Sequence, residues 1–528
     1  MLQALYDKWK SKVVTGEERP VTPGLLCLYN SIPALELLNK HIVNKSRIAV
    51  HCDVDMDGIG SGYITKRFIG SITSTPQLYF INKEKIHGIQ TKHYEFFRNY
   101  PIDLLIILDS SSNDIDIIKK FNCDVIVVDH HEIDHTEYSG YTNDGHSFII
   151  VNNMIGNSDN KTLESWIRSK NPLFSENIPE YNADSRMSCG LVVYELYRLY
   201  QEAYRTGPIL ENLMLFQWVG VTLVTDAIQL LTDRNQWYIE NTVHSMNTEP
   251  NLLAMIRSLN PYAVQLDKSI IGYTLAPTFN RAIRAGATGD ALNVAMDYPT
   301  YVTSLSQYRE KQDWAISTGI ENVVENHSYV MRDITNTGIG SNYTGVIAGR
   351  LCDDHNKNAV VYTVDNGIAS GSFRGRMLNT DYRSCFLDYR DDIFAQGHKG
   401  AFGFKVPIED LPNIMAGLVR VESEVDSRPY LTAGSMPEGL RGIYHIDNMG
   451  EFKKCGGLMM LGIGNSKVAS DEQIMITVSS SEATLIEIRG KLYLYDIMGL
   501  TCKAFKEIQP GMINIYVEYS KSIEFYVK

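Results

Sequence analysis

Short runs of apolar, β-branched residues alternate with amphipathic segments along the first third of the chain. Five of these runs are continuously apolar, and they lie at residues 47–54, 77–82, 103–110, 123–130 and 148–153. Strands buried on both faces have this pattern, so it predicts an α/β domain with a parallel sheet and helices on each side. Apolar residues at helical spacing precede the first run, so a helical lead-in is predicted over 1–45.

The remaining sequence predicts three further parts. A helical block covers 188–260, and a helix-like stretch at 300–326 leads to a second, smaller α/β segment. After about residue 430 the chain becomes rich in short alternating strands, which is typical of a small sheet or barrel; an OB-fold is one candidate. We therefore predict these boundaries: 46–298 for the first domain, 299–327 for a connecting helix, 328–415 for the second domain and 430–528 for the β-rich domain.

Composition narrows the class of protein. A chain of 528 residues is too long for one hydrophobic core, and its net charge of −13 argues against a generally basic, DNA-coating protein. A local basic cleft for nucleic acid remains compatible with that charge. The eight cysteines include no CxxC pair, which argues against a zinc ribbon or a disulfide framework and favours a reducing compartment. No apolar run approaches the length of a membrane span, so we expect a cytoplasmic protein.

The first candidate site is an acidic cluster where the first predicted strand ends. His51 is followed by Asp53, Asp55 and Asp57 at alternate positions, with Gly58 next. Neighbouring carboxylates repel each other unless a cation lies between them. Oxygen ligands suit Mg²⁺ or Mn²⁺, and an added histidine favours Mn²⁺. The alternative is an acidic turn before a helix, because aspartate also caps helices.

Three further elements carry the same kinds of ligand. Asp109 ends the third strand, and Asp129, His130 and His131 end the fourth. Histidine is a common transition-metal ligand, and a neighbouring carboxylate can orient its ring. Asp226 lies inside an apolar helical stretch, where a buried carboxylate needs a partner or a metal. Taken one at a time, Asp109 could be a cap and Asp226 a buried, hydrogen-bonded residue.

Together these elements predict one site, because ligand sites in parallel sheets form at the carboxyl ends of the strands. Their carboxylates and histidines are enough to hold two divalent cations. Two such ions, about 3.5–4 Å apart, can activate water and clamp both oxygens of a phosphoryl displacement. The residues therefore indicate a metal-dependent phosphodiesterase.

The order of these motifs resembles the DHH phosphoesterase superfamily, which is named for the triplet found here at 129–131. Within it the sequence is most similar to RecJ-like single-stranded-DNA-specific exonucleases. The segments that carry this likeness beyond the metal motifs are INKEKIHGIQ (81–90), the stretch around Asp226, LAPTFNRAIRAG (275–286), TGVIAGRL (344–351), GSFRGR (371–376), QGHKGAFGF (396–404) and, more weakly, LGIGN (461–465). The likeness implies a DHH domain followed by a DHH-associated domain.

The resemblance also implies roles for single residues. It assigns metal ligands to Asp55, Asp57, Asp109, His130 and Asp226. One more ligand is either Asp53, as in RecJ-type sites, or His51, as in pyrophosphatase-type sites. His131 is expected near the scissile phosphate, so the catalytic set is His131, Asp109 and Asp57. The segment 81–90 is expected to be a loop that faces the substrate.

The second predicted domain supplies positive charge beside glycine-rich turns, where backbone N–H groups and arginine bind phosphate. The expected substrate-binding residues are Arg281, Arg284, Arg350, Arg374, Gly397 and His398. A solvated surface charge is the alternative for each arginine. Gln396 stands where the family signature has glycine, and the asparagine–arginine segment at 280–284 is shifted by one position, so recognition of the substrate end departs from the family pattern.

The leading hypothesis is an exonuclease that uses two divalent cations, Mn²⁺ in preference to Mg²⁺, on single-stranded DNA. The 5′ polarity and a role in DNA repair or recombination come from the resemblance alone. One alternative is a DHH phosphodiesterase of short oligonucleotides or cyclic dinucleotides, which His51 favours. Another is a non-catalytic DNA-binding replication factor of the same family. No protein partner is predicted.

Overall fold

The computed structural model divides the chain into two compact units, Glu18–Tyr308 and a second unit that contains Arg309–Lys528. It describes residues 24–156, 160–174, 187–204, 209–226, 235, 237–239, 241–242, 250–261, 270–326, 329–355, 357–375, 381–390, 392–398, 400–426 and the strands β13 to β19 given below. The predicted helical lead-in is therefore described only from residue 24, and the LGIGN segment lies outside the described residues.

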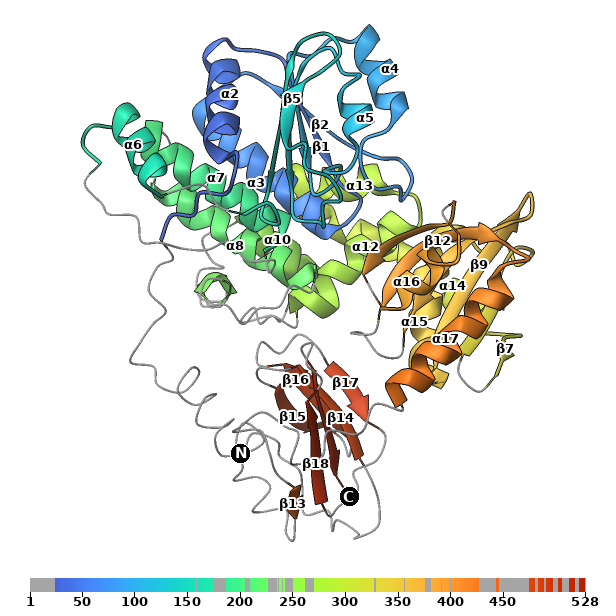
Figure 1. The fold of residues 1–528 in the computed structure, drawn as a ribbon. Coiled ribbons are helices and arrows are strands. Elements are labelled where there is room, and N and C mark those ends of the chain that lie inside the picture. The colour runs from blue at the N-terminus through green and yellow to red at the C-terminus, as the bar shows by residue number, and fades with distance from the viewer. Residues whose placement is uncertain are drawn as a thin grey trace. The chain divides into compact units, whose positions relative to one another are not determined.

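A six-stranded sheet forms the centre of the first unit, in the order β2-β1-β3-β4-β6-β5. Its strands β1, β2 and β5 are labelled in Figure 1. Its strands are β1 (Ile48–Cys52), β2 (Gln77–Ile81), β3 (Leu104–Leu108), β4 (Asp124–Asp129), β5 (Ser139–Tyr141) and β6 (Ser147–Asn152). All neighbours pair in parallel except the edge pair β5–β6, which is antiparallel. The five apolar runs are thus confirmed as the parallel strands. The short strand β5 was not expected from the pattern.

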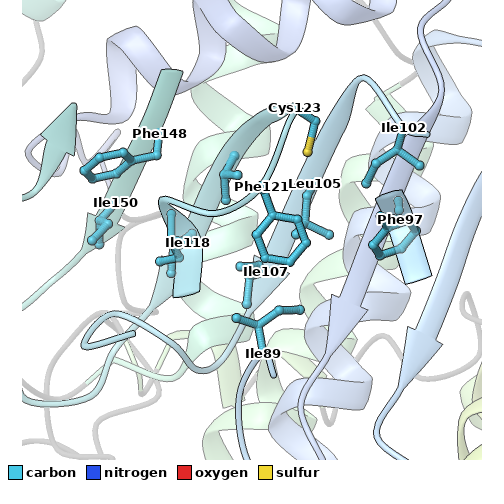
Figure 2. Packing of buried hydrophobic residues seen from close by; sticks show 13 residues of the cluster. Ile89, Phe97, Ile102, Leu105, Ile107, Ile118, Phe121, Cys123, Phe148 and Ile150 are labelled. Carbon is cyan, nitrogen blue, oxygen red and sulfur yellow. The ribbon is translucent and has the colours of Figure 1, made fainter. Parts of the chain in front are cut away.

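Helices cover both faces of this sheet. The helices near it are α2 (Ser31–Val43), α3 (Met56–Ile72), α4 (Thr91–Asn99) and α5 (Ile115–Ile118). On one face, Phe97 of α4 and Ile118 and Phe121 of the α5 region pack against Leu105 and Ile107 of β3, as Figure 2 shows. On the other face, α3 contacts β1 and α2 contacts β6. Continuous burial on both sides explains why β1, β3 and β4 are apolar throughout, whereas the edge strand β2 is only partly buried.

The order in which strands are added to the sheet reverses at β1, which lies between β2 and β3. The chain passes from β1 to β2 on one side and then returns across β1 to form β3 on the other side. In open α/β sheets a crevice forms at such a switch point, outside the carboxyl ends of the strands. The acidic segment after β1 and Asp109 after β3 therefore lie at the position where this topology places ligands.

A helical part completes the first unit. It consists of α6 (Asn160–Lys170), α7 (Cys189–Tyr204), α8 (Ile209–Thr225), α10 (Pro250–Leu259), the π-helix η2 (Ile271–Leu275), α12 (Ala276–Arg284), α13 (Thr288–Met296) and the 3-10 helix η3 (Pro299–Gln307). Helix α3 packs against α7 and α8, which also pack against each other. This packing brings Asp226, directly after α8, toward the sheet edge that carries the other acidic residues.

The second unit begins with α14 (Tyr308–Gly319) and a six-stranded sheet in the order β11-β12-β10-β9-β8-β7. Its strands are β7 (Val324–Glu325), β8 (Tyr329–Asp333), β9 (Asn358–Asp365), β10 (Ile368–Arg374), β11 (Phe394–His398) and β12 (Ala401–Pro407). Helices η4 (Ser341–Tyr343), α15 (Thr344–His355), α16 (Tyr382–Leu387) and α17 (Leu411–Asp426) belong to the same part. This is the second α/β segment expected from the sequence.

Seven strands are described in the β-rich region. They are β13 (Ile443–His445), β14 (Ile474–Ser479), β15 (Ala483–Ile488), β16 (Lys491–Asp496), β17 (Cys502–Phe505), β18 (Met512–Val517) and β19 (Ser522–Val527). They form two antiparallel sheets, β13-β18-β19-β14 and β15-β16-β17. The β-rich character agrees with the sequence pattern, and the OB-fold stays a prediction.

The predicted connecting helix is shorter and less regular than expected. Instead of one helix over 300–326, the chain forms η3, then α14, which ends at Gly319. Asn322 follows with a left-handed φ of 51°, and β7 begins at Val324. None of the helices in the described part of the chain has the length and apolar character required to cross a membrane.

Candidate metal centre

The segment after β1 places three carboxylates in different roles. Asp55 is the N-cap of α3, and its Oδ1 accepts a hydrogen bond of 2.9 Å from the backbone N–H of Gly58. Asp53 is fully buried, and Asp57 lies buried in the first turn of the helix. The sequence offered two interpretations of this cluster, a helix cap or a set of metal ligands. The Asp55 carboxylate is able to serve as both, because the cap hydrogen bond uses only one of its two oxygens.

Glycine at position 58 is required by this arrangement. A Cβ atom on Gly58 would lie 2.6 Å from the backbone nitrogen and 2.7 Å from the backbone oxygen of Asp53. Real Cβ atoms do not approach backbone atoms so closely, so any other residue would push the helix away from the strand end. The helix can therefore begin immediately beside the acidic segment, which keeps all three carboxylates at one place.

Asp57 is fixed by the N-terminus of α7. Its Oδ2 accepts from the backbone N–H of Cys189 at 2.8 Å, and its Oδ1 accepts from Gly190 at 3.0 Å. The positive end of a helix stabilises a carboxylate in this position. Even so, burial and the nearby Asp226 and Asp55 raise the pKa of Asp57 well above its usual value. The carboxylate is held firmly, but its charge lacks a counterion.

Asp109 follows β3 in a left-handed backbone conformation with a φ of 65°, and Ser111 has a φ of 72°. Aspartate tolerates this region better than most residues, and such conformations cluster at functional sites. Both carboxylate oxygens of Asp109 are buried without a hydrogen-bond partner among the described residues. Burial, together with the charges of Asp57 and Asp55, raises the pKa of Asp109 well above its usual value.

Asp129 is saturated with hydrogen bonds. Its carboxylate accepts from the backbone N–H groups of Ser112 at 3.1 Å and of His130 at 2.7 Å. It also lies 2.7 Å from Nδ1 of His131. Although burial opposes ionisation, Asp129 raises the pKa of His131 to about 10. Asp129 therefore orients its neighbours, while His131, with 52% of its side chain exposed, stays cationic and accessible.

His130 connects the elements of the site. Its Nε2 atom lies 3.2 Å from Asp109 Oδ1, 3.5 Å from Asp226 Oδ2 and 3.8 Å from Asp57 Oδ2. It has no hydrogen-bond partner of good geometry among the described residues. Burial lowers the pKa of His130, which keeps its ring neutral. A neutral, buried imidazole that faces three carboxylates is a metal-ligand arrangement.

Three overlapping groups of side chains could each hold a divalent ion, and the ligand atoms within each group lie within 4.8 Å of one another. These groups are Asp57, His130 and Asp226; Asp109, His130 and His131; and Asp53, Asp55 and His87. The unpartnered oxygens of Asp109 and the raised pKa values of Asp57 and Asp109 are the signature of a site that lacks positive charge. The residues present therefore fit divalent cations.

The structure places His51 away from these groups. Its ring lies 5.2 Å from that of Phe80 and 5.6 Å from that of His93, centroid to centroid. Side chains alternate along a strand, so His51, inside β1, faces the helices α4 and α5 together with Ala49. Burial lowers the pKa of His51 to about 3. Of the two candidates for the remaining ligand, only Asp53 lies in a group that could hold a metal.

His87 was not predicted as a candidate site residue. Its Nδ1 contacts Oδ2 of Asp53, and the backbone N–H of Gly88 donates to Oδ1 of Asp53 at 3.0 Å. The Asp53 carboxylate raises the pKa of His87. The sequence feature that could have identified His87 is its place after the second strand, within the segment 81–90 that is expected to face the substrate.

The expected substrate-binding residues lie in both units. Arg281 and Arg284 are in the last turn of α12 in the first unit. In the second unit, Arg350 is exposed on α15, and its Nε donates to Oδ2 of Asp354 at 2.8 Å. This environment also fits the alternative that Arg350 is a solvated surface charge. Arg374 ends β10 beside Gly345, and burial lowers the pKa of its guanidinium.

The glycine-rich segment QGHKGAFGF (396–404) lies in the β11–β12 hairpin. Gly397 has a φ of 131°, and a Cβ atom there would lie 2.8 Å from the carbonyl oxygen of Ala401. Glycine is therefore required at this position by both conformation and close approach. His398 is the last residue of β11. Gln396 pairs with Gly403 in the hairpin, so the departure from the family signature leaves the strand pairing intact.

Comparison with known proteins agrees with this geometry. Residues 47–152, which span β1 to β6, match the family described as DHH family, N-terminal domain. A putative SPbeta prophage-derived single-strand DNA-specific exonuclease, YorK of Bacillus subtilis (strain 168), is 22% identical over 428 residues, which cover 73% of this chain and 67% of the relative.

Solved structures of exonuclease RecJ share the fold. A RecJ structure bound to manganese matches with a TM-score of 0.55 and 18% identity, covering 77% of this chain and 97% of that chain. RecJ of Thermus thermophilus in complex with Mn²⁺ matches with a TM-score of 0.63 and 15% identity, covering 100% of this chain and 76% of that chain. Residues 47–152 therefore match the DHH family, N-terminal domain. The fold of the chain is similar to that of RecJ.

Proposed function

We propose that this protein is a metal-dependent exonuclease that hydrolyses phosphodiester bonds of single-stranded DNA, with attack from the 5′ end. The observation that carries the proposal is the convergence of Asp57, Asp109 and Asp226 on Nε2 of His130, from four separate parts of the chain. A structural role would not need so many buried carboxylates around one neutral imidazole, because each unpaired charge there is costly.

Two divalent cations are part of the proposal, with Mn²⁺ preferred and Mg²⁺ as the alternative. Their ligands would be Asp53, Asp55, Asp57, Asp109, His130 and Asp226. Bound there, the cations would activate a water molecule and stabilise charge on the phosphate. The RecJ structures bound to manganese support this choice of the preferred ion.

The chain's own residues would orient the reacting groups. Cys189 and Gly190 hold Asp57 through backbone N–H groups, which leaves its carboxylate no freedom to turn away from the site. His131 presents a cationic, accessible imidazole, and a phosphate oxygen of the substrate is a suitable partner for it. Asp129 keeps that ring in place through Nδ1, so Nε2 remains the donor toward the substrate.

Substrate binding is assigned to Arg281, Arg284, Arg350, Arg374, His398 and Gly397. The arginines would contact phosphate oxygens, and the tight β11–β12 turn would provide backbone N–H groups. A single strand is the proposed substrate because the relative YorK is named as a putative single-strand DNA-specific exonuclease. His51 lies beside Phe80 and His93 and outside the groups that could hold a metal, which supports the exonuclease proposal over a dinucleotide phosphodiesterase.

The test is digestion of a single-stranded oligonucleotide of about 40 nucleotides in Mn²⁺, labelled at either the 5′ or the 3′ end. We expect the 5′ label to be released first as a mononucleotide, while the 3′-labelled strand shortens progressively. A blunt duplex of the same sequence and a dinucleotide serve as comparison substrates, and both should be cleaved much more slowly. Preferential cleavage of the dinucleotide would support the smaller-substrate alternative, and binding of the strand without turnover would support the non-catalytic one.

A further inference from the structure

The loop between β2 and α4 is fixed firmly against the strand ends. The Nδ2 atom of Asn82 donates to the carbonyl oxygens of Ile86 at 2.6 Å and of Gly88 at 2.8 Å. The backbone N–H of Ile89 donates to Oγ of Ser111, two residues beyond Asp109, at 2.8 Å. Since Asn82 is itself buried, the loop has a defined position relative to both β1 and β3.

His87 projects from this loop toward the acidic segment. Its Nδ1 contacts Asp53, and ligand atoms of Asp53, Asp55 and His87 lie within 4.8 Å of one another. Half of the His87 side chain is exposed, whereas Asp53 is completely buried. An ion that arrives from solution therefore meets the imidazole at the open side of the group.

An independent observation indicates that the acidic residues next to this group lack positive charge. Asp109 is buried, both of its carboxylate oxygens lack a hydrogen-bond partner among the described residues, and its negative neighbours include Asp55. Asp55 itself belongs to the group with His87. The carboxylates thus extend from Asp109 through Asp55 to Asp53, and His87 is at the end of that row.

We propose that His87 is an additional metal ligand, which binds one of the two ions together with Asp53 and Asp55. The inference rests on the proposed function. Each of the two ions then has one imidazole ligand, His87 for one and His130 for the other. Nitrogen ligands favour Mn²⁺ over Mg²⁺, which prefers oxygen, so His87 also determines metal preference at its site.

The competing role for His87 is to position Asp53 through a hydrogen bond, and two variants separate the two roles. Asparagine at position 87 places an amide N–H where Nδ1 of the ring lies, so His87→Asn keeps a donor to Asp53 but has no imidazole. His87→Ala lacks both. His146→Asn is the matched control, because His146 is exposed and lies beside Asp124 at the opposite end of β4.

The experiment is pulsed electron paramagnetic resonance of the full-length protein loaded with Mn²⁺, which counts the nitrogen nuclei coupled to the metal. Wild type and His146→Asn should show two coupled imidazoles, and both His87 variants should show one. A parallel calorimetric titration should show that affinity for one of the two Mn²⁺ ions falls by about tenfold or more in both His87 variants. The affinity for Mg²⁺ should fall less.

An unchanged nitrogen count in His87→Ala would overturn the inference, as would wild-type Mn²⁺ affinity in His87→Asn, which would indicate positioning alone. Circular dichroism in EDTA checks that each variant is folded. A wild-type protein that binds neither Mn²⁺ nor Mg²⁺ would refute the proposed function itself. A wild type that binds Mn²⁺ and degrades single strands, with a nitrogen count unaffected by the His87 variants, would refute only the ligand role.

Discussion

Replacing Asp109 with asparagine is expected to lower the rate of single-strand hydrolysis by about 10³-fold or more, on the scale of losing one essential catalytic group. Asparagine has the same shape and tolerates the left-handed backbone at this position, where φ is 65°. The substitution therefore removes a negative charge without disturbing the β3 end. Initial rates on a labelled single strand in Mn²⁺ measure the effect.

The same variant should be no less stable than wild type in EDTA. Without metal, the buried carboxylate of Asp109 is crowded by Asp57 and Asp55, so a neutral amide relieves repulsion. Asp103→Asn is the control, because Asp103 lies at the other end of β3 in an exposed pair with Arg47. We expect Asp103→Asn to retain activity. Wild-type rates in Asp109→Asn, or unfolding of that variant, would contradict this account of the site.

Removal of the divalent ions is expected to affect both hydrolysis and stability strongly. EDTA should abolish hydrolysis completely, and restoring Mn²⁺ should recover it. Binding to the folded state should also raise stability, by about 2.7 kcal/mol for each ion supplied at roughly 100 times its dissociation constant. The measurement is the thermal unfolding temperature of the full-length protein in EDTA and at increasing Mn²⁺ concentrations.

Asp109→Asn should show a much smaller increase in unfolding temperature with Mn²⁺, because it lacks a ligand. Asp103→Asn should show the full increase. Activity that persists in EDTA, or a Mn²⁺-dependent stabilisation that is the same in wild type and Asp109→Asn, would indicate that the ions bind elsewhere.

Much of the site could be predicted from the sequence because its residues end parallel strands. Asp109 ends β3 and Asp129 ends β4, and the carboxyl ends of parallel strands meet at one edge of a sheet. Asp226 is different, since it is distant in sequence and follows a helix. Its convergence with His130 depends on the packing of α8 against α3, which periodicity alone does not specify.

His51 and His87 show where the sequence was insufficient. His51 has the spacing of a ligand, but it lies inside β1, and the two-residue alternation of a strand turns it toward Phe80. His87 lies in a loop, which has no periodicity from which a direction can be inferred. Its position depends on Asn82 and Ser111, whose hydrogen bonds fix the loop only in the folded chain.

Elements of irregular geometry were also beyond the sequence pattern. The strand β5 has only three residues, and the β11–β12 hairpin lies in a glycine-rich segment that resembles a loop. The conformation of Gly397 and the pairing with β10 stabilise that hairpin, and neither is apparent from local polarity.

In the proposed metal centre, carboxylates and imidazoles from separate elements hold a pair of divalent ions. The most direct test is anomalous diffraction at the manganese absorption edge from crystals grown with Mn²⁺. We predict two peaks, about 3.5–4 Å apart, among Asp53, Asp55, Asp57, Asp109, His130 and Asp226. Peaks that lie only at other positions, or no peak at a Mn²⁺ concentration that supports hydrolysis, would rule out a metal centre at these residues.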